Sequence, residues 1–410
     1  MDFDFSPRAA EVADRAETFF QREILPRHRD WHAADGAPDW LPGLRDKARA
    51  AGLWNMGLTR LPEGVPGTPL SNLDFAPVAE ITGRLPWASY VFNCHAPDLP
   101  NMITLADTGT PEQQDRWLMP LLRGEMRSAF AMTEPAVGSS DARNIAMRAE
   151  RTERGWALTG RKWWASGAAH PDCAFLIVMA ATGEPGGRNS HSAFIVPTDA
   201  PGLEIVRSLR FLGWSETGGG GTELDFQGVE VSEDALLGRE GGGFEVAQTR
   251  LGPARVHHAM RAMGLAEVLI GLMTARAAER RTFGRTLSEY DTVQGWIARS
   301  RVELEQARLL VLRAAWRLDR QGHAATWGDV SAVKIAVPAM LQGIADRAVQ
   351  VFGAMGGTDD TPIHAAFAQA RAFRIFDGPD EVHLRQLFRQ EAPPAGPLAD
   401  SPYLTPGTPA

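Results

Sequence analysis

The stretch Ala129-Phe130-Ala131-Met132-Thr133-Glu134-Pro135, continued by Gly138-Ser139-Ser140-Asp141, lies where the character of the sequence changes. Before it, apolar residues recur at the three- and four-residue spacing of amphipathic helices. From about Met126 they fall into short runs separated by Gly, Pro and Asp, a pattern typical of strands and turns. From Gly242 the helical spacing returns. The sequence therefore predicts a β domain between two helical domains.

Apolar stripes and short runs support this division of the chain. Helical stripes comprise Ala10, Val12, Ala13, Ala16, Phe19 and Phe20 near the N-terminus, and Leu304, Ala307, Val311, Ala314, Ala315 and Leu318 near the C-terminus. Beside the second stripe, Glu305 is within helical reach of Arg301 and Arg308. The strand-like runs are Trp156–Thr159, Cys173–Met179, Ser192–Pro197 and Thr222–Phe226.

The 410-residue chain is long enough for two or three domains of about 100–200 residues each. We expect an α+β protein with an N-terminal helical domain over residues 1–125 and a β-barrel or sandwich over 126–238. A C-terminal four-helix bundle would occupy residues 239–391. Residues 392–410 are rich in Pro and poor in apolar side chains, which predicts a disordered tail.

Composition excludes some classes of protein. The net charge of -8 argues against a nucleic-acid partner, because phosphate binding needs clustered Lys and Arg. Two cysteines, Cys94 and Cys173, make neither a disulfide framework nor a metal cluster, so we expect no metal site and a reducing compartment. No apolar run reaches the roughly 18 residues of a membrane span. The N-terminus has no secretory pattern. We therefore expect a cytoplasmic protein.

Three segments in a fixed order resemble the acyl-CoA dehydrogenase family, and the likeness covers about Phe5 to Arg389. They are Ala129–Asp141, Arg280–Gly284, and Gln350–Gly357 followed by Arg374–Gly378. Within the family, the sequence is most similar to the branch of animal family members ten and eleven and their bacterial relatives. The residues that carry this finer likeness are Lys162–Gly167, Arg250–His258 and Asp377–His383.

The resemblance implies an FAD enzyme that oxidises the α–β bond of an acyl-CoA thioester. By this resemblance Asp377 is the catalytic base that removes the α-proton, where many family members carry Glu. We expect a dry pocket to raise its pKa. The alternative from the residues alone is a turn before a helix, since Asp-Gly-Pro-Asp is a good turn sequence. Asp380 and Glu381 are the next candidates for the base.

The resemblance also implies where the cofactor and the substrate bind. Thr133, with the nearby backbone of Phe130 and Met132, is expected beside the flavin ring, as are Trp164 and Ser166. Alternatively, Trp163 and Trp164 are β-domain core. Glu381 matches a position that touches flavin. Ser139 is expected near both the cofactor and the thioester, Arg255 near the CoA end of the substrate, and Gly378 beside the base.

A second set of predicted cofactor residues lies further along the chain: Arg280, Thr282, Gln350, Gly353 and Ala354. The guanidinium of Arg280 would bond the pyrophosphate in a fork. The alternative is a solvated helix charge. The resemblance implies that these residues reach the FAD of a neighbouring subunit. We therefore expect a homodimer or homotetramer.

Other readings remain open. Nitroalkane oxidases also resemble this family and use Asp as the base, and acyl-CoA oxidases pass electrons to oxygen instead of an electron-transfer flavoprotein. A non-catalytic, DNA-associated protein on the same scaffold would be expected to carry a basic groove. His257 and His258 are neighbours on a predicted helix and should point apart, so a structural role is expected for each.

Overall fold

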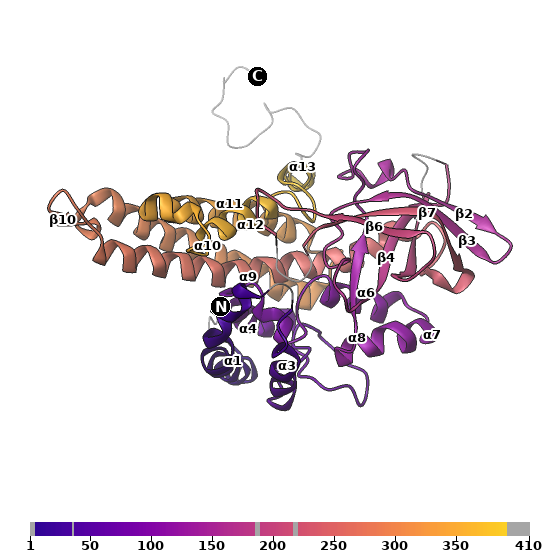
Figure 1. Ribbon diagram of the computed structural model, residues 1–410, viewed down its shortest axis with the longest axis horizontal. Coiled ribbons are helices and arrows are strands. Elements are labelled where there is room, and N and C mark those ends of the chain that lie inside the picture. Colours follow the sequence, from indigo (N-terminus) through magenta and orange to yellow (C-terminus); the bar gives the residue numbers. More distant parts are fainter. Residues whose placement is uncertain (1–4, 35–36, 185–188, 216–219, 392–410) are drawn as a thin grey trace, which may run out of the picture.

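The protein is described from a computed structural model that covers residues 5–34, 37–184, 189–215 and 220–391. A long helical bundle extends to one side, a β-sheet lies at its other end, and the N-terminal helices pack beneath both (Figure 1). The predicted helical, β, helical order is confirmed. The predicted tail, 392–410, lies outside the described residues.

The N-terminal part is built from short helices. They are α1 Pro7–Phe19, α2 His28–Ala33, α3 Leu41–Ala50, α4 Asn72–Gly83, α5 Ala88–Val91, α6 Asp98–Thr108, α7 Pro111–Gln113 and α8 Met119–Arg123. Ser6 caps α1 by accepting a hydrogen bond from the Ala9 N–H. On α1 the buried residues are Ala9, Val12 and Ala16. The buried stripe therefore begins at Ala9 and not at Ala10, as the sequence predicted.

The middle part is one mixed sheet. Its strands are β1 Arg127–Ala131, β2 Arg148–Thr152, β3 Gly155–Lys162, β4 Cys173–Ala181, β5 His191–Pro197, β6 Leu203–Ser208, β7 Thr222–Ser232 and β8 Leu236–Leu237. The order across the sheet is β6-β7-β3-β2-β4-β5-β8, and β1 pairs in parallel with β4. All the residues of β4 are buried or nearly so, which explains its unbroken apolar run.

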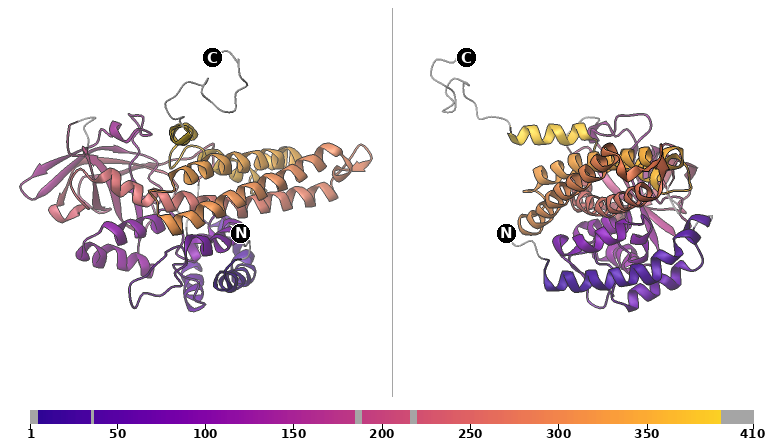
Figure 2. Two further views of the ribbon diagram at one scale, coloured as in Figure 1. Left: turned by 180° about the vertical axis from the view of Figure 1, so that it is seen from behind. Right: turned by 90° about the vertical axis from the view of Figure 1, so that its left-hand side faces the viewer.

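The C-terminal part is an extended bundle. It contains α9 Gly243–Glu279, α10 Asp291–Gln321, α11 Trp327–Phe352, α12 Ile363–Phe373 and α13 Asp380–Glu391. A two-stranded hairpin, β9 Arg281–Thr282 and β10 Arg285–Thr286, forms the far tip of the bundle (Figure 1). Helix α13 crosses α11 and stands apart from the long axis of the bundle (Figure 2). In the described ranges, none of these or the other helices is long and apolar enough to cross a membrane.

The predicted stripe on α10 is fully buried, and Glu305 pairs with both Arg301 and Arg308 as expected. Arg308 also reaches Glu80 of α4 at 2.7 Å and Glu267 of α9 at 2.9 Å. Arg308, which the sequence indicates only as a partner of Glu305 on the same helix, thus joins α10 to α4 and α9. The two cysteines are free and buried.

Helix α9 joins the three parts, because it packs against α4 and α6, against β5, and against α10 and α11. It crosses α4 so closely that two glycines face backbone. A Cβ on Gly264 would overlap the main-chain oxygen of Glu80, and a Cβ on Gly83 would overlap that of Arg261. Only glycine fits at both positions without moving the helices apart.

We predict that Gly264→Ala lowers the stability of the protein by at least about 1–3 kcal/mol, because the new methyl group forces α4 away from α9. Gly271→Ala is the matched control on the same helix, since a Cβ there meets nothing and the position is exposed. The control should gain about 0.5–1 kcal/mol from helix propensity. Thermal unfolding of the two proteins measures the difference, and equal midpoints would show that the crossing tolerates a methyl group.

Candidate active site

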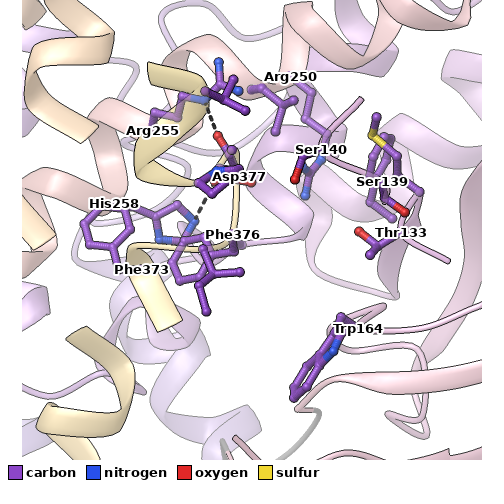
Figure 3. Close-up of a pocket in the computed structure, with 18 of the residues that line it drawn as sticks. Thr133, Ser139, Ser140, Trp164, Arg250, Arg255, His258, Phe373, Phe376 and Asp377 are labelled. Carbon is purple, nitrogen blue, oxygen red and sulfur yellow. Dashed lines mark hydrogen bonds and ion pairs between the residues drawn. The ribbon is translucent and has the colours of Figure 1, made fainter. Parts of the chain in front are cut away.

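One large cleft lies where the three parts of the chain meet. Its volume is about 1680 Å³, and its walls come from the N-terminal helices, the β-sheet, α9 and the segment 372–389. Thr133, Ser139 and Trp164 lie on one side of the cleft, and Asp377 with Phe373 and Phe376 lies on the other (Figure 3). Such a volume exceeds the roughly 300–1,000 Å³ of a pocket for one small ligand, so the cleft has room for two molecules.

Asp377 lies in the turn between α12 and α13. Its side chain is 15% exposed and lines the cleft. Its backbone has φ 56°, and Gly378 follows with φ 97°. Asp tolerates this left-handed conformation better than most residues. The residue therefore occupies the turn that its sequence predicts and also presents a carboxylate to the cleft.

Three side chains fix the turn around Asp377 by bonding to main-chain oxygens of the turn. The Nε of Arg255 donates to the main-chain oxygen of Asp377 at 2.8 Å, and the Nε2 of His383 lies 3.2 Å from the same oxygen. The Nζ of Lys334, a fully buried lysine on α11, donates to the oxygens of Phe373 at 2.5 Å and Phe376 at 2.8 Å. These bonds hold the left-handed turn in one conformation.

The pKa of Asp377 is lowered, which corrects our expectation of a raised value. Burial by itself would raise the pKa, but His258, Arg250, Lys334 and Arg255 together lower it below its ordinary value. The expected rise considered only the dry pocket, whereas the positively charged Arg250, Lys334 and Arg255 also face the carboxylate. The carboxylate of Asp377 is therefore ionised at neutral pH.

A buried ion pair fixes the opposite wall. The Nζ of Lys162, at the end of β3, lies 2.7 Å from Oε1 of Glu134 and donates to the main-chain oxygen of Met132 at 2.9 Å. Glu134 also accepts from the N–H groups of Ala146 and Met147. Burial lowers the pKa of Lys162 to about 8, although Glu134 opposes this shift. The pair fixes the backbone on both sides of Thr133, which remains exposed at the cleft.

Trp164 is also directed to the cleft. Its side chain is 38% exposed, its backbone has φ 55°, and its ring meets the edge of Phe211. Trp163 lines the cleft as well and is half-buried, so neither tryptophan is simply core. Three polar atoms in the cleft wall, Nε1 of Trp163, Oε1 of Gln248 and Nη1 of Arg255, are buried and have no hydrogen-bond partner among the described residues. Such atoms are usually satisfied by a ligand or by water.

The structure separates the predicted site residues into two groups. Those that line the cleft are Phe130, Met132, Thr133, Ser139, Trp164, Ser166, Arg255, Asp377 and Gly378. The second group lies where α9 and α11 end, since Arg276 of α9 stacks on Phe352 of α11, and the β9–β10 hairpin follows α9 there. Its members are Arg280, Thr282, Gln350, Gly353 and Ala354. Glu381, which is exposed on the first turn of α13, is not among the residues that line the cleft.

Other cleft residues were missed by the sequence analysis or given only a structural role. Lys334 and His383 hold the Asp377 turn, and Arg250 stacks on Phe130 at 4.3 Å within the cleft wall. His258 and His257 point apart as expected: His257 bonds Asn72, whereas His258 faces Asp377. The sequence does carry a signal for Lys334, namely a lysine within the mostly apolar helix α11. A lysine is rarely buried without hydrogen-bonding partners, so it indicates a polar contact there.

Comparison with known proteins identifies the family. The N-terminal, middle and C-terminal domain models of the acyl-CoA dehydrogenases match residues 6–125, 129–229 and 241–391. The chain belongs to the acyl-CoA dehydrogenase family. It is therefore an FAD-dependent oxidoreductase.

The relatives also confirm the expected branch. The chain is 44% identical to "Probable acyl-CoA dehydrogenase FadE2" of Mycobacterium tuberculosis, over 95% of this chain and 97% of that protein. It is 40% identical to "Acyl-CoA dehydrogenase family member 11" of Rattus norvegicus, of which it spans only 51% while 95% of this chain is covered. A solved structure from Mycobacterium abscessus, assigned there as an acyl-CoA dehydrogenase, is 42% identical with a TM-score of 0.90 and covers 95% of this chain and 99% of that one.

The cleft of this chain fits FAD. It combines an exposed indole, which can pack against a flat ring, with buried polar atoms that need a partner. Its volume is large enough for a flavin ring and a second molecule.

We predict that Lys162→Met destabilises the protein by about 3–5 kcal/mol, because the charge of Glu134 is left buried without its partner. Adding Glu134→Gln to Lys162→Met should recover part of the loss. The exposed pair of Arg60 and Asp107 is the control: Arg60→Met should cost less than about 1 kcal/mol. Thermal midpoints of the four proteins test this, and a midpoint of Lys162→Met equal to that of Arg60→Met would contradict it.

Proposed function

We propose that the protein catalyses the FAD-dependent α,β-dehydrogenation of an acyl-CoA thioester to a trans-2-enoyl-CoA. Asp377 removes the α-proton, and the hydride leaves the β-carbon. Bound FAD supplies the acceptor for this hydride at its N5. The observation that carries the proposal is an ionised carboxylate, Asp377, directed into a cleft whose other wall carries Thr133 and Trp164 (Figure 3).

The surroundings of Asp377 support its role as the base. Its lowered pKa means that the carboxylate is charged and able to accept a proton at neutral pH. Phe373 and Phe376, stacked with ring centroids 5.1 Å apart, make the adjoining wall apolar. A bound acyl chain would exclude water from this side and make the carboxylate a stronger base than it is in the free protein.

Further side chains would hold the reactants. Thr133 and Ser166 offer hydroxyl groups near the flavin, and the indole of Trp164 offers a packing surface for its ring. Ser139 is held in place because its Oγ accepts a hydrogen bond from the Glu134 N–H at 3.0 Å. The Nε of Arg255 bonds the main-chain oxygen of Asp377, and its Nη1, which is buried without a hydrogen-bond partner among the described residues, is available to the substrate.

The two groups of predicted cofactor residues support an oligomer. Arg255 in the cleft and Arg280 at the end of α9 are about 37 Å apart, at about 1.5 Å per helical residue. The cleft contains none of the second group among its described lining residues, and Arg280, Gln350 and Gly353 are exposed on this chain. A homodimer or homotetramer in which the tip of one bundle meets the cleft of another would bring the two groups to one FAD.

The electron acceptor and the acyl group are part of the proposal as well. We expect an electron-transfer flavoprotein as the acceptor. The presence of Asp where many family members carry Glu keeps a nitroalkane-oxidase-like reaction as the second candidate, with an acyl-CoA oxidase as a further variant.

Anaerobic bleaching of the bound FAD by a panel of acyl-CoAs and nitroalkanes tests the reaction, and oxygen consumption tests the acceptor. Bleaching by nitroalkanes alone would contradict the proposed function.

We predict that Asp377→Asn retains FAD and binds acyl-CoA, yet reduces its flavin at least 10²–10⁴-fold more slowly, an order-of-magnitude estimate for the loss of a general base. The amide keeps the size of the side chain but cannot take the α-proton. Asp380→Asn is the comparison, because Asp380 is held by Arg374 at 2.7 Å outside the predicted reaction centre. Stopped-flow reduction under anaerobic conditions reads the step. A wild-type rate for Asp377→Asn would mean that the base is elsewhere.

We predict that Arg280→Ala weakens FAD binding about ten- to a hundredfold, because a charge-assisted fork to the pyrophosphate is lost. Arg299→Ala removes an exposed arginine from α10 and should leave FAD affinity unchanged. Mixed oligomers of Arg280→Ala and Asp377→Asn subunits test the sharing of sites. If each FAD takes Arg280 from the neighbour, one of the two sites in such a pair is intact and activity returns. No recovery of activity on mixing would contradict shared sites.

A further inference from the structure

His258 of α9 is placed against the carboxylate of Asp377. Its Nε2 lies 3.8 Å from Oδ2 of Asp377, and its ring meets the edge of Phe376 at 5.2 Å between centroids (Figure 3). The side chain is 24% exposed and lines the cleft. His258 is thus next to the proposed base, on the same side of the cleft.

The hydrogen-bonding partner on the other side of the ring fixes its tautomer. The Nη2 of Arg261 lies 2.9 Å from Nδ1 of His258. A guanidinium group only donates hydrogen bonds, so Nδ1 must accept and the neutral ring carries its proton on Nε2. Burial first, and then Arg261, lowers the pKa of His258 to about 3, with Lys334 and Arg250 acting in the same direction and Asp377 opposing. The ring is therefore neutral at neutral pH, and the group that faces Asp377 is an N–H donor.

We propose that His258 is a positioning residue, which orients the carboxylate of Asp377 through its Nε2–H and favours the charged form of that carboxylate. This inference rests on the proposed role of Asp377 as the base. At 3.8 Å the contact is longer than a hydrogen bond, so the proposal includes a side-chain movement that shortens it when the site is occupied. The donor engages one carboxylate oxygen and leaves the other directed to the cleft. Arg261, on the next turn of α9, holds the ring in turn.

The charged and titratable groups that face this pair come from every neighbouring element. Arg250, Arg255 and Arg261 belong to α9, Lys334 to α11, His383 to α13, and His95 to the segment between α5 and α6. Lys334, Arg250 and Arg255 are cations that favour ionised Asp377 whatever happens at His258. Removing His258 therefore shifts the titration of Asp377 and does not abolish its charge.

The sign of the expected effect follows from which form His258 stabilises. Its N–H favours the carboxylate, so it lowers the pKa of Asp377, and its removal raises that pKa. The base acts only when ionised, so the rate falls as the pH drops through the pKa of Asp377. Loss of the N–H should therefore move the acid limb of the rate profile to higher pH. A hydrogen bond to a charged group corresponds to a shift of about one to two pH units, a ten- to hundredfold change.

The test is the pH dependence of anaerobic flavin reduction in three variants of the FAD-loaded enzyme. His258→Leu removes the donor and should shift the acid limb upwards. His258→Gln places an amide N–H near the position of Nε2 and should restore the limb towards that of the wild type. His258→Asn has an amide too short to reach and should resemble His258→Leu. If His258→Leu does not fold, the comparison of Gln with Asn decides. His257→Gln is the control, since an amide can still reach Asn72 and the residue points away from the cleft; its profile should match the wild type.

The outcomes separate this inference from the proposed function. A shifted limb in the Leu and Asn variants, restored by Gln, supports the role of His258. Unchanged limbs in all three, with Asp377→Asn inactive, would overturn it and leave Asp377 as the base. Equal rate losses in all three without a shift of the limb would show a purely structural role and would also overturn it. A wild-type rate for Asp377→Asn would instead overturn the proposed function itself.

Discussion

The architecture depends on the close crossing of α4 and α9. Gly83 and Gly264 each face a main-chain oxygen of the other helix, so the two backbones pack without side chains between them. This contact sets the position of α9, which also packs on the sheet and forms the centre of the bundle. Arg255 and His258 lie one or two turns before the crossing on α9, Arg261 lies at it, and all three line the cleft. Any separation of the two helices would therefore move the residues that face Asp377.

Two buried lysines fix the walls of the cleft by the same physical means. Lys162 binds the carbonyl of Met132 on the sheet side, and Lys334 binds those of Phe373 and Phe376 on the bundle side. Burying an ammonium group is costly, so each persists only because its hydrogen bonds are satisfied. Burial lowers the pKa of each to about 8, in the direction expected when the charged form is disfavoured. The side chains that approach the reactants are thus carried by backbone that cannot relax easily.

Periodicity was sufficient to predict the α10 stripe and the unbroken run of β4, because both patterns arise from burial of a whole face. It misplaced the start of the α1 stripe by one residue, since alanine is small enough to be either inside or outside. Nine of the residues that the resemblance predicts for the site line one cleft, and the role that it implies for each of them stays a prediction. Spacing along the chain could not supply the lowered pKa of Asp377, because the responsible Arg250 and Lys334 come from two different helices. Nor could it show that His258 faces that carboxylate.

The backbone at Asp377 suggests why this chain carries aspartate there. The residue has φ 56°, a left-handed conformation that Asp and Asn adopt more readily than longer residues do. Holding a residue in such a conformation costs about 1–3 kcal/mol, and here Arg255 and His383 on its carbonyl, with Lys334 one residue earlier, oppose that cost. The same conformation recurs at Trp164 on the opposite wall and at Phe283, 95% exposed at the tip of the hairpin. Left-handed backbone therefore presents a side chain on each wall of the cleft and at the hairpin tip, and it also occurs elsewhere in the described residues, at Asn55, Asn93, Asn189 and Leu212.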